Sequence, residues 1–398
     1  MRCLLEGLGA ALVAGVLTVG CAAGSGATGA APTGAARAGT SALTPALSQG
    51  ERGQTEAARA ASGAPAASGG AAGASAGSAG AAPALATVHV GIVGATTEVG
   101  QYLALDRGYF EEAGLQPDFV RFDSTPQMTA PLSTGDLDVG SGAIGAGLFN
   151  AMERGVDVRI VGPQARYEPG RSAVSVLVAK DLGDSGAIRD WPDLRGRKLA
   201  VPSRNSSTEY ALDVALRRAG LALTDVDLSE MGMADITVAL ANRGVDAALQ
   251  IEPQATIAAE QGIAVRREGP GDWLPGIQYT VVLYGPGFAQ RNPDAARRWM
   301  VAYLRGLRDF SDAWVKERGN RDEIVATITR HTALKDPALI TKIGWPVLDP
   351  NGQINTDSIR DQIRWYVERG VMQAETDLGK AVDMQYVQYA LGVLGPYE

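Results

Sequence analysis

The feature that most constrains the fold is the uneven distribution of aromatic residues. All 6 Phe, 6 Trp and 11 Tyr of the 398-residue chain lie after residue 85. Residues 1–85 instead hold 17 of the 50 glycines, set among Ala, Ser, Pro and Thr. Because folding must offset chain entropy by burying bulky apolar side chains, this first stretch cannot build a core. The sequence therefore confines the globular body to residues 86–398.

Charge and cysteine content exclude several classes of protein. Residues 1–85 contain four Arg and three Glu, which leaves the body with 32 basic and 41 acidic groups and a net charge of −9. So acidic a body is unsuited to nucleic acid, and we predict no nucleic-acid partner. Both cysteines, Cys3 and Cys21, precede the body, which excludes a disulfide scaffold. The two histidines, His89 and His331, are far apart, so we expect no metal site and no cofactor.

The N-terminus resembles the export signal of a bacterial lipoprotein. Residues 8–19 form an apolar run that is too short to cross a bilayer but typical of a signal peptide. Thr18-Val19-Gly20-Cys21 resembles a lipobox, in which the signal is cleaved and the cysteine is lipidated, although Leu is usual at the position of Thr18. An ordinary secretory signal with an incidental cysteine is the alternative. We predict a signal peptide over residues 1–21 and an extracytoplasmic protein, in the periplasm or cell envelope, anchored to a membrane through Cys21.

Residues 22–85 have the composition of a flexible linker. A random coil of about 60 residues has an average span of roughly 40 Å. That reach suits a globular domain tethered to a membrane.

The body alternates between strand-forming and helix-forming segments. In the first part, strands are predicted at 87–93, 117–122, 137–140, 156–161 and 173–179, and helices at 101–113, 127–133 and 145–154. After about residue 180 the pattern restarts, with strands at 198–201, 226–230, 246–251 and 263–267 and helices at 207–219, 236–242 and 254–261. A strand at 279–284 and mostly helices from 293 onward complete the chain.

This alternation is typical of α/β proteins with parallel sheets covered by helices, and its restart predicts two lobes. If the C-terminal helices pack on the first lobe, the chain crosses between lobes near Lys180 and near Val281. We therefore assign residues 86–180 to the first part of lobe I, residues 181–280 to lobe II, and residues 281–398 to the second part of lobe I and the C-terminal helices.

A glycine-rich turn raises an enzymatic alternative. The segment 91–100, GIVGATTEVG, follows a strand and opens a helix, and it resembles the dinucleotide-binding turn of semialdehyde dehydrogenases. Asp123 lies where a ribose-binding acid is expected. Against an NAD(P)-dependent dehydrogenase, Thr97 replaces a glycine at the pyrophosphate, and the body lacks the cysteine nucleophile that acyl-forming dehydrogenases need.

Four motifs in order resemble a known family. They are YLALDRGYFEEAGL at 102–115, LSTGDLDVG at 132–140, DLRGRKLAV at 193–201, and GVDAA at 244–248 followed by Glu252-Pro253. These segments resemble signatures of ABC-transporter substrate-binding proteins of the nitrate, sulfonate, taurine and thiamine-pyrimidine-precursor family. The matches run from about residue 88 to 255, with a compatible helical C-terminus.

The resemblance implies a type II periplasmic binding protein fold, with two doubly wound lobes joined by two crossover strands. Such a protein closes on a small ligand, an organic or inorganic anion or a heterocyclic precursor, and delivers it to a membrane permease and its ATPase. We expect a monomer without enzymatic activity, because the enzyme branch of the family depends on a Cys-rich motif and a histidine that have no counterpart here. An envelope sensor with the same fold is a further alternative.

Candidate ligand-binding residues follow from chain geometry, because ligands of open α/β sheets bind outside the carboxyl ends of strands. The turn at 203–208, SRNSST, favours an anion, since hydroxyls and an amide open a helix there. Ordinary helix capping is the alternative explanation. Glu98 and Glu252 would oppose an anion or clamp an amine, which leaves the ligand charge open. The predicted binding residues are Thr96, Thr97, Gln101, Ser141, Gly142, Ala143, Arg166, Tyr167, Arg204, Asn205, Ser206, Ser207 and Glu252.

Overall fold

The computed structural model describes residues 85–398, which belong to one compact unit. The predicted signal peptide, the lipidation site at Cys21 and nearly all of the predicted linker lie outside the described residues. Within residues 85–398, no helix has both the length and the apolar character needed to cross a membrane.

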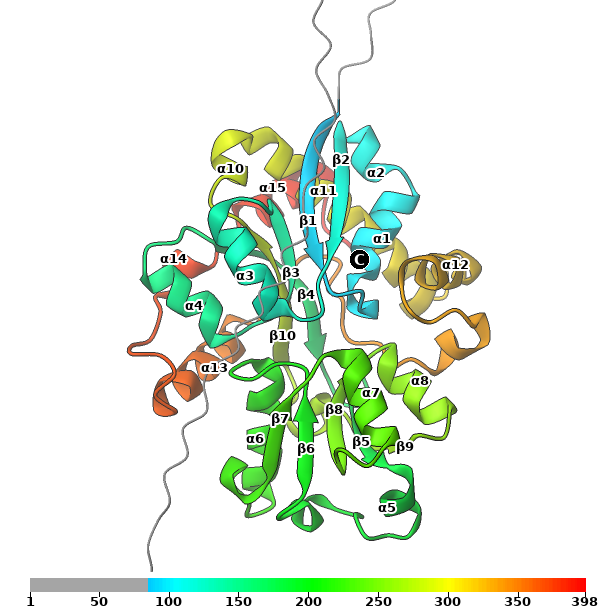
Figure 1. Ribbon diagram of the computed structural model, residues 1–398. Coiled ribbons are helices and arrows are strands. Elements are labelled where there is room, and N and C mark those ends of the chain that lie inside the picture. The colour runs from blue at the N-terminus through cyan, green and yellow to red at the C-terminus, as the bar shows by residue number, and fades with distance from the viewer. Residues whose placement is uncertain (1–84) are drawn as a thin grey trace, which may run out of the picture. The chain divides into compact units, whose positions relative to one another are not determined.

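The first lobe is built on a five-stranded sheet (Figure 1). Its central strand β3 is parallel to β1, and β1 is parallel to β2. Strand β10 enters between β3 and β4 and is antiparallel to both. In spatial order the strands are β2 (Leu115–Arg121), β1 (Ala86–Ile92), β3 (Val139–Ala143), β10 (Ile277–Tyr284) and β4 (Arg159–Tyr167).

The second lobe is built on another five-stranded sheet with a similar plan. Strand β6 is parallel to β7 and β8, whereas β5 is antiparallel to both β8 and β9. In spatial order the strands are β7 (Asp227–Glu230), β6 (Lys198–Val201), β8 (Ala247–Ile251), β5 (Val174–Ala179) and β9 (Ala264–Arg266).

Both sheets are mixed, which corrects the expectation of parallel sheets. The antiparallel pairings involve β5 and β10, the strands that follow each passage of the chain from one lobe to the other. Each enters its new sheet without a preceding βα crossover, so nothing fixes the parallel direction. The passages also occur earlier than predicted, because the chain leaves the first sheet after Tyr167 and re-enters it at Ile277.

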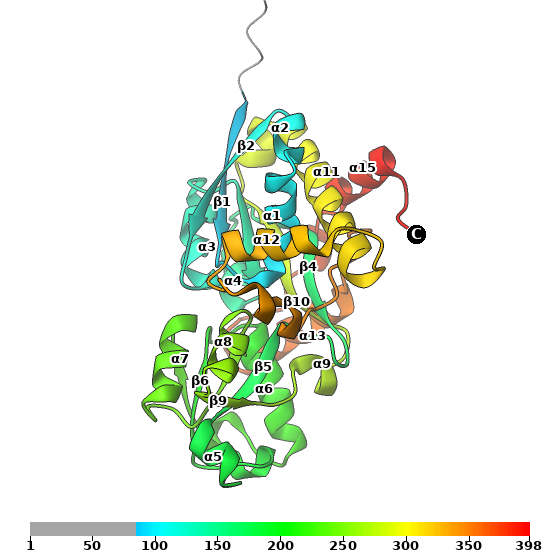
Figure 2. The same ribbon diagram turned by 90° about the vertical axis from the view of Figure 1, so that its right-hand side faces the viewer.

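Helices cover both faces of the first sheet, as Figures 1 and 2 show. Helices α1 and α11 pack on one another, and α12 lies against α1. The predicted helix over 101–113 is divided in two, because Gly108 adopts a left-handed conformation with φ of 72°. The helices of this lobe are α1 (Val99–Asp106), α2 (Tyr109–Glu112), α3 (Thr125–Thr134), α4 (Ala146–Glu153), α10 (Phe288–Arg291), α11 (Pro293–Phe310), α12 (Arg321–His331), α14 (Leu378–Ala381) and α15 (Gln385–Leu394).

The second lobe carries α6, whose N-terminus faces the first lobe. Ser207 at that end contacts main-chain atoms of β10 and of the segment after β3. The helices of this lobe are α5 (Lys180–Asp184), α6 (Ser207–Arg218), α7 (Met233–Ala241), α8 (Gln254–Glu260) and α9 (Pro270–Trp273).

Helix α13 (Thr356–Glu368) joins the lobes from the side. It packs on β10 of the first sheet and on α6 of the second lobe. Trp365 donates its indole N–H to Asp213 of α6 at 2.6 Å and makes an edge contact with Tyr210. Gln362 accepts a 2.7 Å hydrogen bond from the Ser207 hydroxyl. Helix α13, from the C-terminal part of the chain, thus holds the second lobe against the first.

Helices α1 and α11 approach each other closely at a pair of glycines. The main chain of Gly100 lies directly against Gly306, so that a Cβ atom added at Gly306 would sit 2.0 Å from the carbonyl oxygen of Gly100. Only a residue without a side chain permits this contact. The approach fixes α1, and with it the turn that follows β1, against the sheet.

We predict that Gly306→Ala lowers the free energy of unfolding by about 1–3 kcal/mol, because the new methyl group forces α1 and α11 apart. Gly392→Ala in α15 is the control, since a Cβ there meets no atom within 4 Å. That change should be neutral or stabilising by up to about 1 kcal/mol. Urea unfolding followed by circular dichroism measures both, and equal effects of the two changes would contradict the packing argument.

Candidate ligand-binding site

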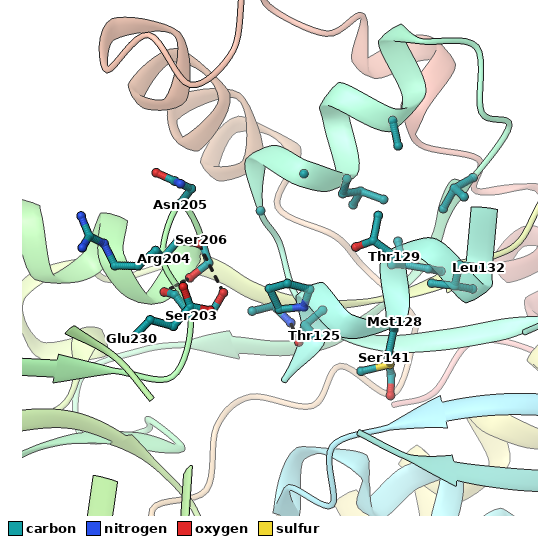
Figure 3. Close-up of a pocket in the computed structure, with 18 residues that line it drawn as sticks. Thr125, Met128, Thr129, Leu132, Ser141, Ser203, Arg204, Asn205, Ser206 and Glu230 are labelled. Carbon is teal, nitrogen blue, oxygen red and sulfur yellow. Dashed lines mark hydrogen bonds between the residues drawn. The ribbon is translucent and has the colours of Figure 1, made fainter. Parts of the chain in front are cut away.

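A cavity of about 250 Å³ lies where the two lobes meet (Figure 3). One side comes from α3, α4 and the end of β3, and the other comes from the turn between β6 and α6. The apolar wall consists of Pro126, Met128, Leu132, Ala143, Leu148, Ala151, Val158 and Leu283. The polar side chains are those of Thr125, Thr129, Ser141, Ser203, Arg204, Asn205, Ser206 and Glu230.

Main-chain hydrogen bonds join the lobes beside this cavity. The Ser207 N–H donates to the carbonyl oxygen of Ile144 at 2.8 Å, and the Ala146 N–H donates to that of Asn205 at 2.9 Å. Gly145 and Ser206 form a bridge between these two bonds. A Cβ at Gly145 would lie 3.2 Å from the Asn205 carbonyl oxygen, so a glycine fits this approach. The lobes therefore meet in a closed arrangement along one edge of the cavity.

The cavity contains some of the sequence-predicted binding residues and not others. Ser141, Ala143, Arg204, Asn205 and Ser206 line it. The remaining predicted residues do not line it; they are Thr96, Thr97, Gln101, Gly142, Arg166, Tyr167, Ser207 and Glu252. Ligand binding by either group stays a prediction.

Several residues outside the lining have structural partners. Tyr167 stacks on Tyr279, with ring centroids 4.4 Å apart. Arg166 pairs with Glu168 at 3.3 Å. Gly142 packs so closely on α3 that an added Cβ would lie 2.2 Å from the hydroxyl of Thr125.

Thr96 and Gln101 differ from these residues because the polar atoms of their side chains have no hydrogen-bond partner. Both residues are fully buried. The hydroxyl of Thr96 and both amide atoms of Gln101 make no hydrogen bond within residues 85–398. Buried polar groups are normally satisfied by protein, water or a bound molecule. These two side chains therefore mark a polar position at the start of α1 that a small molecule or water can satisfy.

Sequence reasoning missed the contribution of α3. Thr125, Met128, Thr129 and Leu132 all line the cavity from this helix. They recur at spacings of three and four residues, which places them along one helical face. That spacing is the signal in the sequence, but the helix predicted over 127–133 was given no binding residues.

The turn after β1 is occupied by the carboxylate of Glu98. Its oxygens accept hydrogen bonds from the N–H groups of Val93 and Gly94 at 2.8 Å and of Ala95 at 2.9 Å. The Tyr102 hydroxyl donates a fourth bond at 2.7 Å. Burial raises the pKa of Glu98, while these hydrogen bonds act in the opposite direction. The side chain thus fills a main-chain nest that is suited to an anion.

A second glutamate occupies the turn after β6. Glu209 is fully buried and accepts a 2.5 Å hydrogen bond from the Asn205 N–H. Its other oxygen pairs with Arg204 at 2.8 Å and with Arg369, just beyond α13, at 3.2 Å. The Ser206 hydroxyl caps the helix by accepting from the Thr208 N–H at 3.2 Å. The predicted anion position at the start of α6 is therefore occupied by the protein itself.

A third glutamate occupies the turn after β8. Glu252 is fully buried and accepts from the N–H of Thr256 at 3.0 Å and of Gly344 at 3.1 Å. Arg266 pairs with the same carboxylate at 2.6 Å. Three of the strand-end turns predicted to bind the ligand, those after β1, β6 and β8, thus each contain an internal carboxylate.

This arrangement weighs against the dinucleotide interpretation. In such a turn, free main-chain N–H groups approach the pyrophosphate. Here the N–H groups of Val93, Gly94 and Ala95 are bonded to Glu98. As a separate finding, residues 85–398 contain no group of three His, Cys, Asp or Glu side chains placed to hold a metal ion.

The two lobes, their strand orders and the cavity between them define a bilobal α/β protein with the periplasmic binding protein fold. The solved structure of the nitrate-binding protein NrtA from Synechocystis PCC 6803 matches with a TM-score of 0.66 and 13% identity, over 79% of this chain and 90% of that one. Residues 95–312, more than half of the chain, match the NMT1/THI5-like family. The chain belongs to this family.

Two curated relatives illustrate the range of the family. A protein of Escherichia coli (strain K12) that is named for aliphatic sulfonate binding is 30% identical over 223 residues, which cover 56% of this chain and 64% of that protein. A 4-amino-5-hydroxymethyl-2-methylpyrimidine phosphate synthase of Aspergillus parasiticus is 23% identical over 222 residues, which cover 51% of this chain and 60% of the synthase. The chain thus matches less than two thirds of the length of each.

We predict that Glu98→Gln lowers the free energy of unfolding by about 1–3 kcal/mol at pH 7, because an amide nitrogen would face main-chain donors. Burial raises the folded-state pKa above 4.5, so the native state binds the proton more tightly than the unfolded chain. The contribution of Glu98 to stability therefore falls as pH rises from 4.5 through the folded-state pKa.

The difference in unfolding free energy between wild type and Glu98→Gln should accordingly be larger at pH 4.5 than at pH 7. Denaturant titrations at both pH values measure it. Glu112→Gln is the control, because Glu112 is exposed and pairs with Arg305 at the surface; its effect should stay within about 0.5 kcal/mol. A Glu98→Gln protein as stable as wild type would contradict the assigned role.

Proposed function

We propose that the protein is an extracytoplasmic solute-binding protein of an ABC importer, anchored through Cys21. It captures a small solute in the cavity between its lobes and passes it to a permease that is driven by a cytoplasmic ATPase. Family membership supports the binding role, and the relative named for sulfonate binding supports it further. We assign no chemical step to any residue, although one relative is a synthase.

The observation that carries the proposal is the composition of the cavity wall. Met128 and Leu148 come from the first lobe, whereas Ser203 and Asn205 come from the second. A solute that contacts both walls binds better when the lobes are together, so binding favours the closed state. Coupling of this kind turns occupancy into a change of shape that a permease can recognise.

The hinge of this motion follows from the fold. The chain passes between the lobes after Tyr167 and before Ile277. Both passages begin or end at strands of the first sheet that lie side by side, β4 and β10. Neighbouring passages allow one lobe to rotate on the other with changes in only a few main-chain angles.

We predict that Gly147→Leu weakens solute binding at least about tenfold, because a side chain at this position of α4 takes space in the cavity. A Cβ added at Gly147 meets no atom within 4 Å, so the fold should tolerate the change. The solute is first identified by thermal-shift screening of the full chain with sulfonates, taurine, nitrate, carboxylates, pyrimidines and flavins, since binding to the native state raises the melting temperature.

Gly392→Leu is the matched control, because it makes the same substitution at a helical glycine with open space that does not line the cavity. It should bind like wild type in isothermal titration calorimetry. Binding that survives Gly147→Leu would place the solute elsewhere. Absence of any stabilising solute from the panel would count against the proposed function itself.

A further inference from the structure

We propose that the solute bound in this cavity carries no anionic group, and that an apolar body and uncharged hydrogen-bonding groups fix it in place. This inference rests on the proposed function and concerns the same site. It departs from the names of the sulfonate-binding and nitrate-binding relatives.

The first argument is that three turns at strand ends, where main-chain N–H groups could bind an anion, are already filled by carboxylates that do not themselves line the cavity. Glu98, Glu209 and Glu252 are each 0% exposed. Glu98 and Glu209 accept main-chain N–H groups of strand-end turns, and Glu252 accepts that of Thr256 in the first turn of α8. These are donors on which an incoming anion would otherwise rely. An anion would have to displace an internal carboxylate that is held by several hydrogen bonds at 2.5–3.1 Å.

The second argument concerns the positive charge of the site. Among the described residues that line the cavity, Arg204 is the only Arg or Lys. Its Nε donates to Glu209 at 2.8 Å, and its Nη1 donates to the carbonyl oxygen of Leu228 at 3.1 Å. In Figure 3 its guanidinium points away from Thr129 and Ser141. Two of the three guanidinium nitrogens of Arg204 are therefore bonded to the protein.

The third argument is the sign of the remaining charge. Glu230 lines the cavity, and the Ser141 hydroxyl that lines it lies 3.3 Å from the buried carboxylate of Glu98. Glu98 is fully buried and Glu230 is exposed, so Glu98 would repel an anion beside Ser141 strongly, whereas solvent screens the repulsion from Glu230. An uncharged head group avoids that cost.

The cavity wall matches an uncharged, partly apolar solute. Apolar side chains of α3, α4 and β10 line the cavity, with Met128, Leu132, Leu148 and Leu283 as the largest. The hydroxyls of Thr125 and Thr129 and the amide of Asn205 supply neutral donors and acceptors. Amides, alcohols and neutral nitrogen heterocycles are the head groups that such side chains recognise.

Matched pairs of probes test the inference on the full wild-type chain. Benzamide and benzenesulfonate share one phenyl ring, and butyramide and propane-1-sulfonate share one propyl chain, so only the head group differs within each pair. Calorimetry should give a dissociation constant at least about tenfold lower for the amide in each pair. Tighter binding of a sulfonate that is lost in Gly147→Leu would overturn the inference while leaving the proposed function intact.

A second test removes the internal carboxylate of Glu209. It tests the inference even if none of these probes binds the wild-type protein. Glu209→Gln removes the negative charge that pairs with Arg204 and Arg369, and leaves one acceptor oxygen where the carboxylate has two for these arginines and the Asn205 N–H. Methanesulfonate should then stabilise the variant saturably, compared with sodium chloride at equal ionic strength, with an apparent affinity at least about tenfold above wild type. Glu317→Gln is the matched control, because it removes one charge from an exposed ion pair with Arg321.

The two tests have distinct outcomes. Stabilisation of Glu209→Gln alone by methanesulfonate supports the view that the native turn is closed to anions. Equal stabilisation of wild type overturns that view, and so does a folded Glu209→Gln protein that ignores methanesulfonate. If Glu209→Gln fails to fold, the response of the wild-type protein to methanesulfonate and to the probe pairs still tests whether the site accepts an anion.

Discussion

Three buried carboxylates hold together the turns on which the two lobes meet. Glu98, Glu209 and Glu252 each reach back to the main-chain N–H groups of the turn beside them, and two of the three also bind arginines. A charge-assisted hydrogen bond is stronger than a neutral one, and in a buried setting an unpaired donor is costly. These turns therefore depend on buried charges that do not line the cavity.

The same contacts connect the lobes to each other. Glu252 accepts from Gly344, which lies in the segment between α12 and α13, and its carbonyl oxygen faces the Thr96 N–H at 3.4 Å. Glu209 reaches Arg369 just beyond α13. Two of the three carboxylates thus act both as supports for a turn and as links across the cleft. Stability of the turns and closure of the lobes are for this reason physically coupled.

Much of the fold could be predicted from the sequence, because β6 at Lys198–Val201 and the alternation around it are local patterns. The site was harder to predict. Ser141 and Ser206 were found from the rule that ligands lie beyond strand ends, and both line the cavity. Glu98 and Glu252 were noted as residues facing a ligand, but their carboxylates turn back on the main chain. Thr129 was missed because the residue spacing places it on one face of α3 but does not show that this face lines a cavity.

The strand order of the first sheet has a consequence for how the chain matures. Strand β10 lies between β3 and β4, yet the whole second lobe separates β4 from β10 in sequence. As the chain emerges from the ribosome or a translocation channel, the edges of β3 and β4 that pair with β10 stay unpaired until residues 277–284 have emerged. The second lobe is continuous and can form first, and its compaction shortens the loop that β10 must close. Folding of the nascent protein is therefore ordered: the second lobe forms first, and the sheet of the first lobe is completed when β10 adds to it.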